Sequence, residues 1–245
     1  MVAFFGKALP SDKYPGYRYC NLTTCGTTLA LASPSPSGAI GGLIGVDGDL
    51  YYHVTGYLSD PSTASVNRVP GNNDGTIGTT VKIGNYPTSD TRLAIDNAFV
   101  YYIRTDTAGA QPNLVACDRF TGCKSYPTLV SGQPINFAAH GGRLYWIEGL
   151  VLKSCLATDP ASANTVASLP TAFNSDMLVD ESNVYFLTST SIAYCSRPAC
   201  AGGVKTLVAG LTEPSYLRSE GSYLYWLAKS DAAATTSGIY RVAKP

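Results

Sequence analysis

Short apolar runs alternate with polar turns along the whole chain. In each repeat an apolar run ends in an acidic or polar turn, and an aromatic cluster follows within a few residues. The first tyrosine of this cluster recurs at intervals of 40 to 50 residues, at Tyr51, Tyr101, Tyr145, Tyr185 and Tyr225. The residues between the two runs are rich in Gly, Asp and Ser, as tight turns require. Each pair of runs therefore predicts a β-hairpin.

Two further short runs follow each hairpin except the last, which is followed by a third run only. The third runs lie at 17–20, 66–69, 114–117, 152–155, 192–195 and 239–242, and the fourth at 28–31, 80–83, 128–130, 165–167 and 206–208. Four short strands per 40 to 50 residues are typical of a propeller blade. A helical solenoid would need longer runs with a period of 3.6 residues, and the sequence contains none.

The pattern predicts one all-β domain over 1–245, a β-propeller of about six four-stranded blades whose first and last blades are incomplete. The repeats lie approximately at 1–37, 38–87, 88–132, 133–170, 171–210 and 211–245. The first repeat begins at a second strand and the last ends after a third strand, so the two partial blades overlap and cannot merge. We expect either a piece of a longer propeller or a six-bladed ring that lacks strands at its seam. Open sheet edges at 2–5 and 239–242 would then pair with another strand.

Six of the seven cysteines form pairs at one repeat position, just after the third strand. The pairs are Cys20 with Cys25, Cys117 with Cys123, and Cys195 with Cys200, whereas Cys155 has no partner in its own repeat. Loops this short can close a disulfide. Zinc binding is the alternative, but it needs two pairs that converge, and these pairs lie in separate blades. Disulfides predict a secreted, cell-surface or periplasmic protein, whose leader is absent from this chain.

Composition excludes several classes of function. Lys and Arg together number 17, as do Asp and Glu, so no basic surface for nucleic acid is indicated. No apolar run is long enough to span a membrane. A G-x-S-x-G nucleophile motif and a phosphate-binding loop are both absent. His140 occupies the position where other repeats carry Asp or Glu, which makes it a turn residue.

One repeat position varies in its chemistry. The residue four before the acidic turn position is Leu43, Arg92, Asn136, Asp176 or Tyr216, and Arg218 lies two residues beyond the last of these. In a propeller such positions converge on one cavity. We therefore predict a ligand-binding set of Arg92, Asn136, Asp176, Tyr216 and Arg218 for a small polar ligand or the tip of a peptide, the alternative being a hydrated channel without a ligand. The recurring aromatic pairs are interpreted as core packing between blades.

The repeat, an apolar strand ending in Asp, a turn, and a strand with Tyr-Tyr or Tyr-Trp, resembles the blades of six-bladed propellers of the YWTD, NHL and gluconolactonase-like kind. With its cysteine pairs it is similar to uncharacterised secreted bacterial propellers. Thr-Asp does not follow the Tyr-Trp pair here, so the resemblance does not imply receptor-like ligand binding. Gluconolactonase-like enzymes hold a divalent cation with Glu, Asn and Asp, and only Asn136 and Asp176 match in kind.

The sequence therefore favours an extracytoplasmic binding or protein-interaction module over an enzyme. Its partner would be a protein, a small polar ligand or a glycan, with no cofactor. One alternative is a metal-dependent hydrolase or lyase with a channel-bound cation such as calcium, held by Asp176 and Asn136, with His140 as the base. Another alternative is a carbohydrate-binding lectin.

Overall fold

The structure, a computed structural model, describes residues 2–4, 18–20, 29–30, 40–46, 49–54, 64–71, 78–85, 87, 92–105, 111–125, 127–131, 134, 136–169, 173–231, 233 and 235–245. Within these ranges every regular element is a β-strand, and none is a helix. The chain divides into two compact units, one of residues 1–93 and 100–126, the other of residues 94–99 and 127–245.

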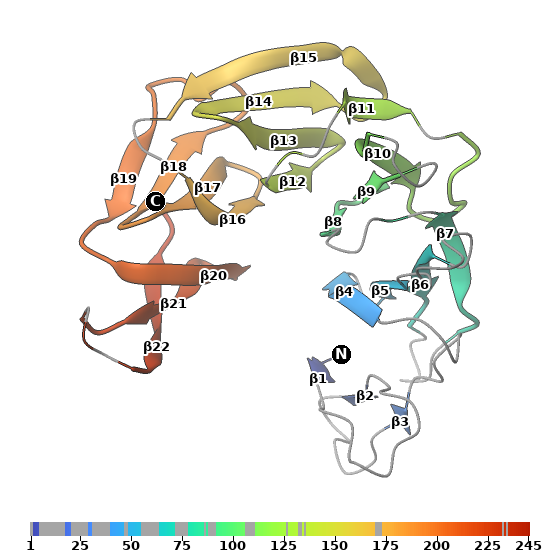
Figure 1. Cartoon of the computed structure of the whole chain (residues 1–245), viewed down its shortest axis with the longest axis horizontal. Helices are drawn as coiled ribbons and strands as arrows, with labels where there is room; N and C mark the ends of the chain where they lie inside the picture. Colours follow the sequence, from blue (N-terminus) through green and yellow to red (C-terminus); the bar gives the residue numbers. More distant parts are fainter. Residues whose placement is uncertain are drawn as a thin grey trace. The chain divides into compact units, whose positions relative to one another are not determined.

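The first half of the chain contributes three sheets (Figure 1). The first contains β1 (Val2–Phe4), β2 (Arg18–Cys20) and β3 (Leu29–Ala30). The second contains β4 (Ile40–Val46), β5 (Asp49–Val54), β6 (Ser65–Val69) and β7 (Val81–Asn85). The third contains β8 (Ala94–Ile95), β9 (Phe99–Arg104), β10 (Asn113–Asp118) and β11 (Thr128–Ser131).

The second half contributes three more. The fourth sheet contains β12 (Asn136–His140), β13 (Arg143–Glu148), β14 (Val151–Leu156) and β15 (Asp159–Ser168). The fifth contains β16 (Phe173–Val179), β17 (Asn183–Thr188), β18 (Ile192–Ser196) and β19 (Lys205–Val208). The sixth contains β20 (Thr212–Glu220), β21 (Tyr223–Lys229) and β22 (Ser237–Ala243).

In every sheet, strands that are consecutive in the sequence are neighbours in space, as short connections dictate. Four-stranded meanders that follow one another define a β-propeller. The prediction of an all-β propeller is therefore confirmed, including first and last blades with three strands each among the described residues. That residues 1–245 form one single domain stays a prediction.

The hairpin between β12 and β13 shows how the sequence determines a turn. His140 pairs with Arg143, and only Gly141 and Gly142 lie between them. Both glycines have positive φ, 62° and 73°. A two-residue loop with this geometry matches the twist of the strands that it joins, and glycine adopts it without steric cost. This hairpin agrees with the prediction that His140 is a turn residue, because His140 directly precedes the two glycines of the loop.

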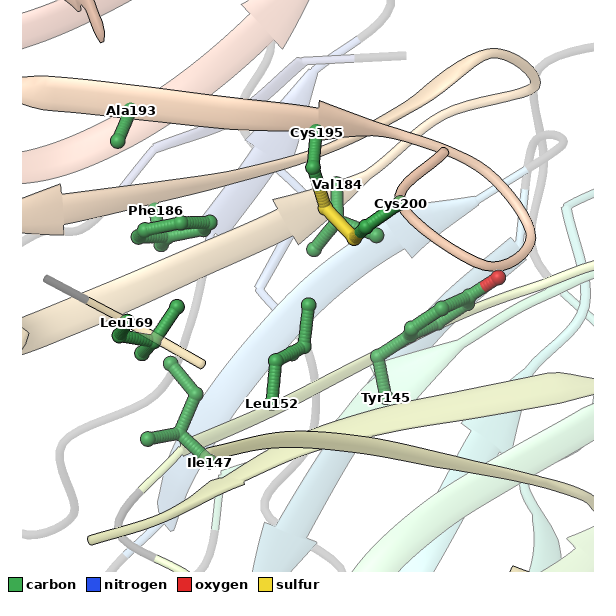
Figure 2. Packing of buried hydrophobic residues seen from close by; sticks show 9 residues of the cluster. All are labelled: Tyr145, Ile147, Leu152, Leu169, Val184, Phe186, Ala193, Cys195 and Cys200. Carbon is green, nitrogen blue, oxygen red and sulfur yellow. A yellow bond between two sulfur atoms is a disulfide. The ribbon is translucent and has the colours of Figure 1, made fainter. Parts of the chain in front are cut away.

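Consecutive sheets in the second unit pack face to face. Tyr145 and Ile147 of β13 belong to one buried cluster with Val184 and Phe186 of β17, and Figure 2 shows these side chains pointing toward one another. On the opposite face of β17, Tyr185 and Leu187 form a second cluster with Leu217, Leu224 and Trp226 of the next sheet. Full burial of one such side chain contributes about 1.5–3 kcal/mol to the free energy of folding. Every residue of β17 is buried because both faces of its sheet are covered.

Candidate functional site

The structure distributes the predicted ligand-binding residues over the first strands of their sheets. Asn136 begins β12, Asp176 lies in β16, and Tyr216 and Arg218 lie in β20. In the second unit β12 contacts β16, and β16 contacts β20. Arg92 belongs to the first unit, where it is exposed just before β8. Asn136 is almost fully buried, whereas Tyr216 and Arg218 are exposed. Asp176 is half-buried, so the two exposed residues of the predicted set in the second unit both lie on β20.

The backbone of β20 is irregular at the predicted site. Glu213 and Tyr216 have positive φ, 47° and 56°, and the pairing with β21 shifts register at both places. Such a conformation costs a non-glycine residue about 1–3 kcal/mol. The carboxylate of Asp176 accepts a hydrogen bond from the Leu217 backbone N–H at 3.2 Å, which holds the chain directly after Tyr216. The ring of Tyr216 is left 62% exposed.

One face of the sixth sheet carries a group of arginines and tyrosines. Arg218 and Arg241 both lie opposite Tyr225 in the strand register, so the three side chains share a face. The Arg241 guanidinium carbon lies 4.9 Å from the centroid of the Tyr223 ring, and that ring lies 6.4 Å from the ring of Tyr225. We refer to Arg218, Tyr223, Tyr225 and Arg241 as the arginine–tyrosine face.

This face differs from its counterparts in the two preceding sheets. Tyr145 and Tyr185 occupy the position of Tyr225, and both are fully buried. On the sixth sheet Tyr225 is only partly buried, Tyr223 is 39% exposed, and the neighbouring Ile239 is 78% exposed. The interpretation of the aromatic pairs as core thus agrees with the burial of Trp226, whereas Tyr225, on the other side of the same strand, is only partly covered.

Several acidic side chains that the structure describes form ion pairs with lysine or arginine. Glu148 is 2.7 Å from Lys153, and this hydrogen bond lowers the pKa of Glu148. Glu213 is 2.8 Å from Lys229. Among the described residues, no group of three His, Cys, Asp or Glu side chains could hold a metal ion. Nor does the described part of the chain contain a helix long and apolar enough to cross a membrane.

The cysteines of two repeats are bonded as predicted. Cys117 is joined to Cys123 and Cys195 to Cys200, with Cα atoms 4.6 Å and 4.8 Å apart. For these two pairs the zinc alternative is wrong, because their sulfur atoms are bonded to each other. Cys25 lies outside the described residues, so the pairing of Cys20 stays a prediction.

The lone Cys155 is buried and free. Burial raises the pKa of its thiol to about 11. The side chain of Cys155 is fully enclosed by the protein.

Two features of these sites were missed by reasoning from the sequence. The positive φ values in β20 carry no sequence signal, because neither residue is glycine or asparagine. The second feature, an arginine in each described disulfide loop, does have a sequence signal. An arginine stands two residues after the first cysteine of each described disulfide, at Arg119 and Arg197.

Known proteins resemble this chain in fold alone. No family model and no curated protein matches the sequence. Among solved structures, a chain of the nidogen/laminin complex is 16% identical with a TM-score of 0.58, over 92% of this chain and 89% of that one. Puromycin hydrolase is 11% identical with a TM-score of 0.64, over 93% of this chain and 40% of that one. A prolyl endopeptidase is 10% identical with a TM-score of 0.58, and this chain spans 36% of its length. Fold and comparisons together define a β-propeller protein.

Proposed function

We propose that this chain is an extracytoplasmic protein-binding module that recognises its partner through the arginine–tyrosine face and Tyr216. The observation that carries the proposal is the exposure of Tyr216, Tyr223, Arg218 and Arg241 on one sheet. Those of the arginine–tyrosine face lie beside Tyr225, whose counterparts Tyr145 and Tyr185 in the two preceding sheets are fully buried. Tyrosine and arginine are enriched where protein interfaces derive most of their affinity.

The chemistry of the face suits a partner surface that carries carboxylates beside apolar groups. Arg218 and Arg241 present planar guanidinium groups that bind carboxylates with two parallel hydrogen bonds. Tyr223 and Tyr225 offer large rings with few rotatable bonds, so little side-chain entropy is lost on binding. Ile239 adds exposed apolar surface opposite Leu227.

The residues predicted from the sequence enter this proposal in different roles. Tyr216 and Arg218 would contact the partner, and Asp176 would position them through the Leu217 backbone. Asn136 would support the neighbouring first strand, because it is buried. Arg92 is proposed as a ligand contact of the first unit.

Two further observations support the proposal. The two disulfides favour an oxidising compartment, outside the cytosol. The nidogen/laminin structure contains a similar fold in a complex of two proteins, which makes protein binding a reasonable role for the same fold here.

The test is a comparison of surface variants in a binding experiment. Wild-type protein and the double variant Arg218→Ala/Arg241→Ala are immobilised and exposed to extracellular proteins of the source culture. Lys205→Ala, an exposed change on β19, is the matched control. We expect the wild type and the control to retain one partner that the double variant binds at least about tenfold more weakly, a loss of about 1.4 kcal/mol.

The same experiment distinguishes other outcomes. If all three proteins bind the same partner equally, the arginine–tyrosine face is not the binding surface. If the double variant instead melts several degrees lower than the control, the face is packed inside the folded protein. Retention of glycans, with no protein retained, would replace the proposal by the lectin alternative.

A further inference from the structure

The two disulfide-closed loops place an arginine on the preceding sheet in the same way. In the first unit, the Nε of Arg119 donates a hydrogen bond to the Tyr51 hydroxyl at 2.5 Å. In the second unit, the Nε of Arg197 donates one to the Tyr145 hydroxyl at 3.1 Å. In both cases the arginine stands two residues after the first cysteine of the loop, and the tyrosine is the first of the aromatic cluster one repeat earlier.

Each guanidinium also binds groups beside its tyrosine. Arg197 donates to the backbone carbonyl of His140, on the preceding sheet, at 3.0 Å, and to that of Asp180, on its own sheet, at 2.5 Å. Arg119 lies 3.7 Å from the carboxylate of Asp49. The guanidinium carbons lie 5.4 Å and 5.5 Å from the centroids of the Tyr51 and Tyr145 rings. The arginines therefore join two consecutive sheets through several contacts each.

The tyrosine end of each contact is shielded from water, because both tyrosines are fully buried. Arg119 is 2% exposed, whereas Arg197 is half-buried. A buried tyrosine hydroxyl that loses its donor does not regain water, so the interface becomes less stable. Figure 2 shows the hydroxyl end of Tyr145 directed toward the loop that the Cys195–Cys200 disulfide closes.

Both described disulfide loops carry this arginine, whereas the predicted Cys20–Cys25 loop carries Leu22 at the same position. In the repeat with the lone Cys155, the position of the arginine is taken by Ala157. Within the first unit the loop itself also touches the preceding sheet, since the Cys123 N–H donates to the Ile83 carbonyl at 2.9 Å. A closed loop has few conformations, so the disulfide limits where its arginine can lie.

We infer that these loops are redox-dependent clasps, in which the disulfide holds the arginine on the tyrosine of the preceding sheet and reduction releases it. A dithiol supplies the two electrons and two protons, so the cystine becomes two thiols while the dithiol becomes a disulfide. The opened loop regains conformational freedom, the arginine leaves the tyrosine, and the two sheets separate more often.

The test is amide hydrogen exchange of the whole chain, read by mass spectrometry on peptides from β5 and β13. Oxidised protein is compared with protein reduced by dithiothreitol in native buffer. We expect reduction to speed exchange in both strands by about tenfold or more. Oxidised Arg197→Met should reproduce this acceleration in β13 and leave β5 unchanged, and reduction of the variant should add little in β13.

Two control variants distinguish a specific role of the arginine from a general loss of stability. Lys205→Met, on the same sheet as Cys195, should exchange as the wild type does. If Arg197→Met does not fold, Tyr145→Phe removes only the hydroxyl that accepts the hydrogen bond, and it should give the same pattern. The inference is overturned if reduction leaves β13 protected, or if it accelerates exchange equally in wild type and variant, since the arginine would then not transmit the effect of the disulfide.

Discussion

Aspartates at the end of the first strands close a turn with one oxygen and reach the next sheet with the other. Asp180 accepts hydrogen bonds from the backbone N–H groups of Ser182 and Asn183, and its second oxygen lies 3.1 Å from the Lys244 ammonium group. Asp96 accepts from Ala98 and Phe99, and its second oxygen accepts from the Gly142 N–H at 2.8 Å. One residue type thus serves both the hairpin and the contact between sheets.

The Asp180 carboxylate makes stability depend on pH in the acid range. Burial raises its pKa, but the N–H groups of Asn183 and Ser182 and the Lys244 charge outweigh burial, so the pKa is lower than usual. Its stabilising effect is therefore complete above the unfolded pKa of about 4 and is lost as the pH falls through the folded value. We expect Asp180→Asn to lower the free energy of unfolding at pH 7 by about 1–2 kcal/mol and by less at pH 3, measured by urea denaturation. The exposed neighbour substitution Glu181→Gln is the control, and a pH-independent loss would contradict this account.

Tyr185 makes stability depend on pH in the alkaline range. Burial raises its pKa to about 12, although the Asn183 amide donates a hydrogen bond to its hydroxyl at 3.1 Å. An unfolded tyrosine ionises near pH 10, so the folded protein loses stability between about pH 10 and pH 12. Tyr185→Phe should flatten the fall in melting temperature across this window relative to the wild type. An alkaline slope unchanged in this variant would show that Tyr185 does not control the loss.

The Cys155 thiol is expected to be chemically inert while the protein is folded. It is fully buried, and burial raises its pKa to about 11, so thiolate is scarce at pH 8. Iodoacetamide should therefore leave the Cys155 peptide unmodified in native protein and alkylate it completely in denaturant, as read by mass spectrometry. Alkylation of native protein at a comparable rate would contradict the enclosed position of this residue.

At the scale of elements, the hydrophobic pattern predicts the strands that face a core and underestimates those that face solvent. The fourth strand of the fourth sheet was predicted at 165–167, yet β15 extends over Asp159–Ser168. Most of its residues are exposed, so no apolar alternation marks its length. In the sixth sheet, β20 extends over Thr212–Glu220, and the Asp176 carboxylate from another sheet accepts a hydrogen bond from Leu217 in its irregular part.

The strained position in β20 predicts a trade-off between stability and binding. Tyr216 has a φ of 56° and is mostly exposed, so its ring contributes little to the core. Glycine adopts this conformation freely, whereas alanine retains the strain of about 1–2 kcal/mol. We expect Tyr216→Gly to be more stable than Tyr216→Ala by about 1 kcal/mol in urea denaturation, and both to bind the partner more weakly. Equal stability of the two variants would mean that the position is not strained in solution, and unchanged binding would remove Tyr216 from the interface.

At the scale of the whole molecule, the repeated pattern made the propeller fold predictable. The same repetition made it harder to predict which repeat exposes its side chains. Five of the six repeats carry the aromatic cluster, so the sequence could not distinguish Tyr225, which is partly exposed, from Tyr145 and Tyr185, which are buried. The prediction did place Tyr216 and Arg218 on the first strand of the sixth sheet. It omitted Tyr223 and Arg241, because the sequence of one repeat does not show which face of its sheet is left exposed.

The alternative of a cation-dependent enzyme is tested on the intact protein. A cation that binds only the folded protein raises its melting temperature, whereas the proposed binding module requires no cation. We expect melting temperatures in calcium and in EDTA to agree within about 1 °C. A rise of several degrees in calcium, lost on Asp176→Ala, would support the hydrolase alternative instead.

The arginine clasps also bear on how such a protein can be rebuilt from its repeats. The arginine and its tyrosine lie on different sheets, so the sheets that carry Tyr51 and Arg119, or Tyr145 and Arg197, depend on each other. A single sheet grafted into another propeller would bring an arginine and leave its acceptor behind. The smallest piece of this chain suited to transplantation or duplication is therefore a pair of neighbouring repeats.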